Sequence, residues 1–202
     1  NNKLMEEFYN NVKPVITTDE RTNYFNHTYN NNDFGDNASI IIPKSKLLLK
    51  SKKFEDKVYL DNFVSKFRKN NVLRESLIFE KSSERENLLL SYNRIDVALD
   101  TFPYTGGTTS LEASWMCVPI LTLKGDSFIS KCGESVNMNL NMNDWIANNQ
   151  KEYIDKAIKY TKNINQLNDI RSYLIKNSRK SSLFDAKKFS NNFNNNFNNS
   201  EL

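Results

Sequence analysis

Short apolar runs alternate with stretches whose apolar residues recur at helical spacing through the middle of this chain. The runs predict strands at Ser45–Lys50, Glu75–Glu80, Ile95–Asp100 and Pro119–Leu123. The stretches between them predict helices at Phe54–Asn70, Glu84–Tyr92 and Thr108–Met116. Strands that alternate with helices form βαβ units, so we expect an α/β fold, a Rossmann-like parallel sheet with flanking helices.

The two ends of the chain differ from this middle part. Residues 1–43 form a polar lead-in with weak periodicity, and the α/β domain is expected over 44–165. Apolar positions then predict a helix at Lys151–Lys162, at the end of this domain, and C-terminal helices over residues 166–189. The C-terminal helices comprise Gln166–Asn177 and a last helix anchored by Phe184 and Phe189. The Asn-rich segment 190–202 is of low complexity, and we expect a disordered tail.

A Gly-Gly-Thr-Thr turn joins the third strand to the helix that follows it. Gly106 and Gly107 have no side chains, so an anion can approach the backbone closely, and the first N–H groups of the helix point outward. Thr108 and Thr109 add hydroxyl donors, and Glu112, one turn further, can accept hydrogen bonds from a ribose diol. The spacing alone also fits a plain tight turn with a threonine cap. The motif is neither a Walker loop nor G-x-G-x-x-G.

Charge and composition narrow the function classes. The 28 Lys and Arg residues are mixed along the chain with 24 Asp and Glu, which is typical of a solvated surface rather than a nucleic-acid footprint. Cys117 and Cys132 lack metal-ligand spacing, and His27 is the only histidine, so no metal site and free thiols in a reducing cytosol are expected. No membrane span or signal peptide is visible, and we expect a cytoplasmic protein.

Six segments carry a resemblance to a known family. They are LLLK (47–50), IDVALDTFPYTGGTTSLEASWMCVPILTLKG (95–125), FISKCGES (128–135), DWIA (144–147), EYIDKA (152–157) and SSLFDAKKF (181–189). In this order and spacing the chain resembles the nucleotide-sugar-binding half of the O-linked N-acetylglucosaminyltransferase, SPINDLY-like family. The resemblance implies the C-terminal half of a GT-B glycosyltransferase, with residues 44–165 as a nucleotide-sugar-binding domain.

The resemblance also assigns roles. It implies that Gly107, Thr108 and Thr109 hold the diphosphate of a UDP-sugar and that Glu112 binds the ribose. Lys131 stands where the bacterial pattern often has Arg, and it keeps the positive charge without the planar guanidinium fork. The implied reaction moves N-acetylglucosamine from UDP to a protein hydroxyl, with no cofactor or metal because backbone dipoles and lysines stabilise the leaving UDP.

Parts of full family members have no counterpart in the sequence. Full members carry helical repeats and an N-terminal catalytic half, and neither is seen here. The chain begins with Asn1 rather than Met, so we expect a fragment or a processed product. The general base is expected in the other half, and His27, in a polar loop, is interpreted as an exposed residue. No catalytic residue is therefore identified in this chain.

Two other functions stay open. One is a nucleotide-sugar-binding module that needs a partner chain for turnover. The other is a UDP-sugar epimerase-like protein, which needs acid and base residues across a cleft. For that role Asp100 lies near the turn, but its position is that of a residue that ends a strand.

Overall fold

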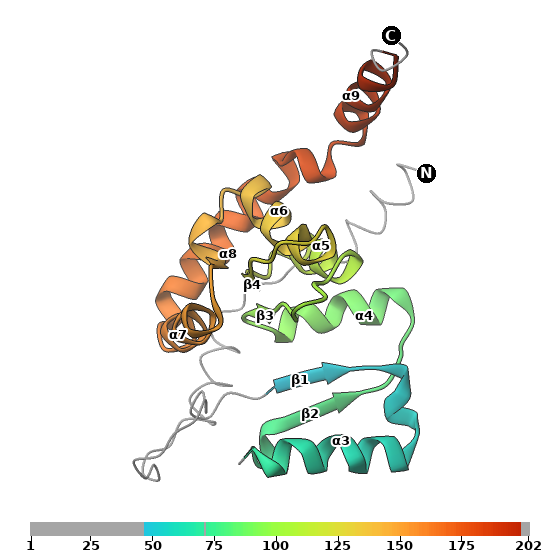
Figure 1. The fold of residues 1–202 in the computed structure, drawn as a ribbon, viewed down its shortest axis with the longest axis vertical. Coiled ribbons are helices and arrows are strands. Elements are labelled where there is room, and N and C mark those ends of the chain that lie inside the picture. Colours follow the sequence, from blue (N-terminus) through green and yellow to red (C-terminus); the bar gives the residue numbers. More distant parts are fainter. Residues whose placement is uncertain (1–46, 71, 199–202) are drawn as a thin grey trace. The chain divides into compact units, whose positions relative to one another are not determined.

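The computed structural model of the chain describes residues 47–70 and 72–198. The chain divides into two compact units, the first ending at Ile95 and the second starting at Asp96. Each unit has its own parallel sheet (Figure 1). The predicted domain of residues 44–165 includes parts of both units, and its boundaries stay a prediction. The lead-in and His27 lie outside the described residues.

The first unit pairs two parallel strands with two helices. Its elements are β1 (Leu47–Lys50), α3 (Lys57–Lys69), β2 (Leu77–Glu80) and α4 (Arg85–Ser91). Leu47 lies opposite Leu77 in the sheet. An aromatic cluster joins α3 to the sheet, with the ring of Phe54 4.9 Å from that of Phe79 and 5.5 Å from that of Phe63. Helix α3 is therefore held to β2 by the aromatic stripe that predicted it.

The helix predicted at Phe54–Asn70 is divided in two. A 3₁₀ turn (Lys52–Glu55) comes first, and α3 begins only after Asp56. The carboxylate of Asp56 accepts hydrogen bonds from the N–H groups of Val58 and Tyr59 at 2.8 and 3.1 Å. Asp56 has extended backbone angles as the N-cap of α3, so it interrupts the helical run.

Glu80, at the end of β2, is the centre of the charged contacts in this unit. It pairs with Lys50 on β1, at 3.3 Å, and with Arg94. Burial alone would raise the pKa of Glu80, but the hydrogen bonds and charges of Arg94 and Lys50 outweigh burial and lower the pKa. These contacts join β1, β2 and the segment after α4.

The second unit is a three-stranded parallel sheet with helices between and after its strands. Its strands, in the spatial order β3-β4-β5, are β3 (Ala98–Leu99), β4 (Ile120–Leu123) and β5 (Ile146–Ala147). Its helices are α5 (Thr108–Trp115), α6 (Cys132–Asn139), α7 (Gln150–Thr161), α8 (Ile164–Asn177) and α9 (Ala186–Asn198). All strand pairs are parallel, which confirms the predicted α/β class.

The middle strand β4 lies in the core of the second unit. All four of its residues are buried, and Leu121 is fully enclosed. Such a continuous apolar run is expected for a strand that is covered on both faces of a parallel sheet. Strand β3 is shorter than the predicted Ile95–Asp100, because the N–H of Ile95 bonds to the carbonyl of Tyr92 in a 3₁₀ turn. The N–H groups of Ala98 and Asp100 bond to the carbonyls of Pro119 and Leu121 in the β4 segment.

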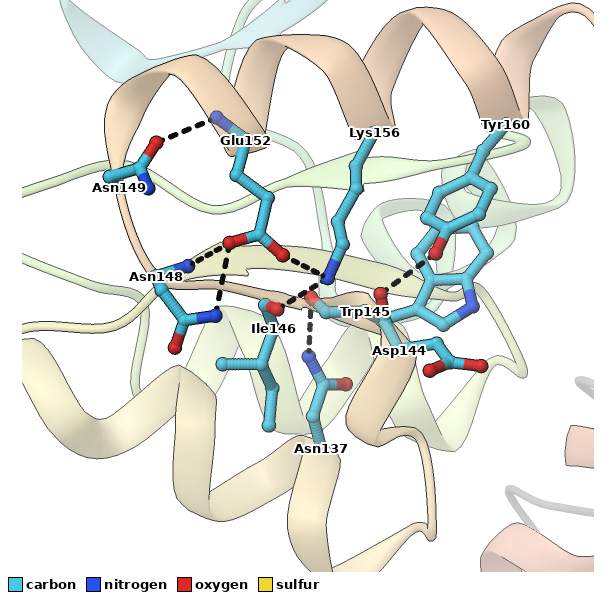
Figure 2. A network of polar contacts seen from close by, with 9 residues as sticks. All are labelled: Asn137, Asp144, Trp145, Ile146, Asn148, Asn149, Glu152, Lys156 and Tyr160. Carbon is cyan, nitrogen blue, oxygen red and sulfur yellow. Dashed lines mark hydrogen bonds and ion pairs between the residues drawn. The ribbon is translucent and has the colours of Figure 1, made fainter.

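Helix α7 is fixed beside β5 by a polar network (Figure 2). The Lys156 ammonium donates to the carbonyl of Ile146 at 2.7 Å and pairs with Glu152 at 2.8 Å. The Glu152 carboxylate accepts hydrogen bonds from the backbone N–H and from the side-chain amide of Asn148. Its pKa is lowered to about 2 by the hydrogen bond from Lys156 first and by those of Asn148 next. The network therefore fixes the direction in which the chain leaves β5.

Two aromatic rings stack between α7 and the segment before β5. The rings of Trp145 and Tyr160 stack with centroids 4.2 Å apart, and the Tyr160 hydroxyl donates to the carbonyl of Asp144 at 2.7 Å. Between α6 and the sheet, the buried Asn137 amide donates to the carbonyls of Ile120 and Trp145. Polar side chains in this unit thus bond to backbone groups where the helices meet the sheet.

The segment predicted as a disordered tail from Ser190 is helical as far as Asn198, as the second half of α9. Phe189 and Phe193 are one helical turn apart, and their rings stack at 6.2 Å. This spacing gives α9 an apolar stripe, although both rings remain mostly exposed. No helix within residues 47–70 and 72–198 has the length and apolar content that crossing a membrane requires.

Candidate functional site

The candidate site lies at the carboxyl ends of β3 and β4, where α5 begins. Gly107 is the N-cap of α5, and no side chain caps the helix there. The N–H groups of the first turn therefore start directly after a residue without a side chain, and the dipole of the helix places partial positive charge at this end. In parallel α/β sheets, ligands bind at this edge.

Asp100 fixes the turn that leads into α5. Its carboxylate follows β3 directly and accepts a hydrogen bond from the N–H of Gly106 at 2.7 Å. It also accepts from the hydroxyl of Thr122 on β4 at 2.8 Å and from the N–H of Thr101. Burial raises the pKa of Asp100, and these three hydrogen bonds act in the opposite direction.

Tyr153 of α7 bonds to the backbone of Asp100. Its hydroxyl donates to the carbonyl of Asp100 at 2.9 Å, and its ring meets that of Phe102 edge to face at 5.9 Å. Burial, and then the negative charge of Asp100, raise the pKa of Tyr153. The end of β3 is thereby joined to β4 and to α7.

The glycines at the site differ in the space around them. A Cβ on Gly106 would lie 2.5 Å from the hydroxyls of Thr109 and Ser110, and a Cβ on Gly133 of α6 would lie 2.2 Å from the Asp100 carboxylate. A Cβ on Gly107 would meet nothing within 4 Å. Gly133 is therefore required by packing, a side chain on Gly106 would displace the hydroxyls of Thr109 and Ser110, and Gly107 faces open space.

The loop after β4 lies next to the loop after β3. The buried hydroxyl of Thr105 donates to the carbonyl of Ile129, which joins the two loops. The hydroxyls of Ser127 and Ser130 lie 2.8 Å apart, and each accepts a hydrogen bond from the other residue's N–H. This hydrogen-bonded turn leads to Lys131, which is exposed at the start of α6.

The predicted site residues fall into three environments. The structure brings Gly106, Gly107, Thr108 and Thr109 together as one turn, with Thr108 and Thr109 exposed. Glu112 lies on α5 and is buried, with 6% of its surface exposed. Lys131 lies on the neighbouring loop. Their roles in binding stay predictions.

Sequence reasoning missed the residues that hold the turn. Thr105, Thr122, Gly133 and Tyr153 had no predicted role, and Asp100 was interpreted as the end of a strand. Asp100 does directly follow β3, but its carboxylate also points back to the turn. The available signal was a carboxylate at the end of an apolar strand that is followed closely by glycines.

The arrangement can bind an anion and stabilise negative charge that develops on it. Among the described residues, no group of three or more His, Cys, Asp or Glu side chains is arranged to hold a metal ion. The two cysteines are free thiols, and burial raises the pKa of Cys117. A reaction without a metal stays a prediction.

Known proteins resemble this chain over most of the described residues. The sequence profile of Glycosyl transferase family 41 matches residues 41–193. A probable UDP-N-acetylglucosamine–peptide N-acetylglucosaminyltransferase SPINDLY from Solanum lycopersicum is 34% identical over 102 residues. A SPINDLY protein with the same description from Petunia hybrida is 28% identical over 158 residues. A solved mutant of the Thermobaculum terrenum O-GlcNAc transferase has a TM-score of 0.74 and 32% identity.

The chain spans a small part of each of these proteins. The tomato match covers 50% of this chain and 11% of the tomato protein, and the petunia match covers 75% and 16%. The structural match covers 77% of this chain and 30% of the bacterial transferase chain. The similarity therefore concerns one segment of much longer proteins.

Proposed function

The chain belongs to glycosyl transferase family 41, and from this premise we propose that it is the donor-binding part of a protein glycosyltransferase. The donor is a UDP-sugar, and by analogy with the described relatives the sugar is N-acetylglucosamine and the acceptor a protein hydroxyl. The diphosphate binds at the start of α5. The family matches favour this function over the epimerase-like alternative.

One observation supports the proposal most strongly, namely the open backbone at the start of α5. Gly107 begins the helix without a side-chain cap, and the space beside its Cα is empty to 4 Å. This open space beside Gly107 leaves room for a phosphate near the N–H groups of the first turn. Thr108 and Thr109, both exposed, offer hydroxyls on the same turn.

The same geometry fits the chemistry of sugar transfer. When the bond from the anomeric carbon to the diphosphate breaks, negative charge accumulates on the leaving UDP. Fixed N–H groups and the positive end of α5 stabilise that charge where it develops. Lys131, exposed on the neighbouring loop, adds a mobile positive charge. The acceptor hydroxyl belongs to the substrate protein, and none of these residues is proposed as the general base.

Calorimetric titration of the full 202-residue chain with UDP and with UDP-N-acetylglucosamine tests the proposal. We expect saturable binding, and we expect Glu112→Ala to weaken it by about 1–3 kcal/mol, the usual loss for hydrogen bonds to a charged group. Asp155→Ala is the matched control, because it removes the same charge from an exposed position on α7. Absence of UDP binding by the folded chain would contradict the proposal.

Turnover is a separate question for the same sample. Release of UDP from UDP-N-acetylglucosamine in the presence of acceptor peptides would identify a catalytic chain. Binding without release would favour the module that needs a partner chain.

A further inference from the structure

We propose that Asp100 is a positioning residue for the donor, because its carboxylate fixes the Gly106–Gly107 turn in the conformation that exposes the first N–H groups of α5. This inference rests on the proposed function, since it concerns the same diphosphate site. It adds a residue that lies behind the turn and does not contact the donor itself.

The hydrogen bond from Gly106 to Asp100 sets the direction of the turn. Asp100 accepts from the N–H of Gly106, so this N–H points back toward the sheet and away from the ligand side of the turn. In a flexible glycine pair this direction is otherwise free. With Gly106 fixed, the next residue, Gly107, begins α5 in a defined orientation.

Asp100 is itself held in place by its neighbours. Its surface is 6% exposed, its carboxylate accepts from Thr122 on β4, and its carbonyl accepts from Tyr153 on α7. The backbone of Gly133 on α6 passes so closely that a Cβ there would overlap the carboxylate. Three elements therefore determine where the carboxylate lies, and the carboxylate determines where the turn lies.

The negative charge of Asp100 does not favour anion binding. A carboxylate directly behind an anion site repels the anion, so Asp100 cannot contribute by electrostatic attraction. Its contribution must come from hydrogen-bond acceptance. An Asn side chain keeps one acceptor for Gly106, can donate its amide to the Thr122 hydroxyl and removes the negative charge. Asp100→Asn is therefore expected to bind the donor at least as well as the wild type.

The test compares UDP affinities of four variants of the full chain by calorimetry. Asp100→Ala, which has no acceptor, should lose at least about tenfold in affinity, as for a lost charged hydrogen-bond network. Asp100→Asn should stay within about threefold of the wild type or bind more tightly, because the acceptor is kept. Tyr160→Phe is the control, because it removes a hydrogen bond of a buried side chain in the same unit, to the carbonyl of Asp144, without touching Asp100 or the turn.

A fourth variant keeps the test decisive if Asp100→Ala does not fold. The double variant Asp100→Val with Thr122→Val removes both partners of one buried hydrogen bond, which costs less than removing one of them. The N–H groups of Gly106 and Thr101 also lose their acceptor, but Thr101 is exposed and Gly106 is half-buried, so water can replace it. The double variant should fold and still lose UDP affinity. Tryptophan fluorescence monitors the folding of every variant, because both tryptophans, Trp115 and Trp145, lie in the second unit.

The outcomes separate this inference from the proposed function. Wild-type affinity in folded Asp100→Ala, or an equal loss of affinity in Tyr160→Phe at equal stability, would overturn the positioning role and leave the donor site standing. A wild-type chain that binds no UDP would overturn both. Loss of affinity in Asp100→Ala, with affinity retained in Asp100→Asn and Tyr160→Phe, supports the role.

Discussion

Replacing Gly133 with alanine tests how tightly α6 packs against the floor of the candidate site. The new Cβ would lie 2.2 Å from Asp100 Oδ2, 2.2 Å from Thr122 Oγ1 and 2.9 Å from Thr122 Cβ. Ordinary contacts of a Cβ begin at 3.4 Å, so α6 and the sheet must separate by more than an ångström, or the Asp100–Thr122 hydrogen bond must break. All three groups are buried, which leaves little room for either movement.

The magnitude follows from three contributions. Overpacking of a core typically costs about 1–3 kcal/mol, and a lost hydrogen bond to a charged group costs about 1.5–3 kcal/mol. Alanine regains about 1 kcal/mol of helix propensity over glycine. Together these contributions lower the free energy of unfolding of Gly133→Ala by about 1.5–5 kcal/mol, and at about 4–8 °C per kcal/mol for a unit of this size the Tm should fall by at least about 6 °C.

Urea and thermal unfolding followed by tryptophan fluorescence measure this loss in the second unit alone, because both tryptophans lie there. Gly107→Ala is the matched control, since its Cβ meets nothing within 4 Å and only the change of N-cap residue applies. That change costs about 1 kcal/mol or less. Equal stability of Gly133→Ala and Gly107→Ala would refute the packing described for Asp100, Thr122 and α6.

Three further predictions concern the rest of the second unit. The pKa of Glu152 is lowered to about 2, so its contribution to stability is present above the unfolded-state pKa of about 4.3 and is lost as the pH falls toward 2. Urea midpoints measured across this pH range should show the loss of stability, and Glu152→Gln should abolish this pH dependence. A thiol reagent should modify the partly exposed Cys132 in the folded chain, whereas the buried Cys117, whose pKa is raised, should react only on unfolding; equal rates would contradict the burial. Tyr160→Phe should lower the free energy of unfolding by about 1 kcal/mol, as one hydrogen bond is lost, and no change in the urea midpoint would refute the contact.

Much of the fold could be predicted because its strongest patterns are local. The apolar run that forms β4 and the periodic stripes of α7 and α8 gave elements close to those observed. The patterns did not show where a capping residue divides a helix, as Asp56 does before α3. They also gave no element at β5, whose two residues are too few for a period to appear.

The candidate site was predictable only in part. The Gly-Gly-Thr-Thr turn could be read directly, because glycines and hydroxyls before a helix have a known physical use. The support behind the turn could not, because Asp100, Thr122 and Tyr153 are distant in sequence and meet only after the sheet and α7 form. The αL backbone of Cys117, with a φ of 58°, was equally hidden, since a short local sequence does not show that a non-glycine residue adopts it.

Binding of a nucleotide diphosphate to the backbone at the start of α5 can be followed residue by residue, by amide NMR of the ¹⁵N-labelled chain during titration with UDP. We expect the largest shifts on the N–H signals of Gly107, Thr108 and Thr109, with smaller shifts at Lys131. Glu112→Ala should reduce these shifts at the same UDP concentration. Shifts that avoid the start of α5 while UDP binds elsewhere, or no shifts in the folded chain, would contradict a diphosphate site there.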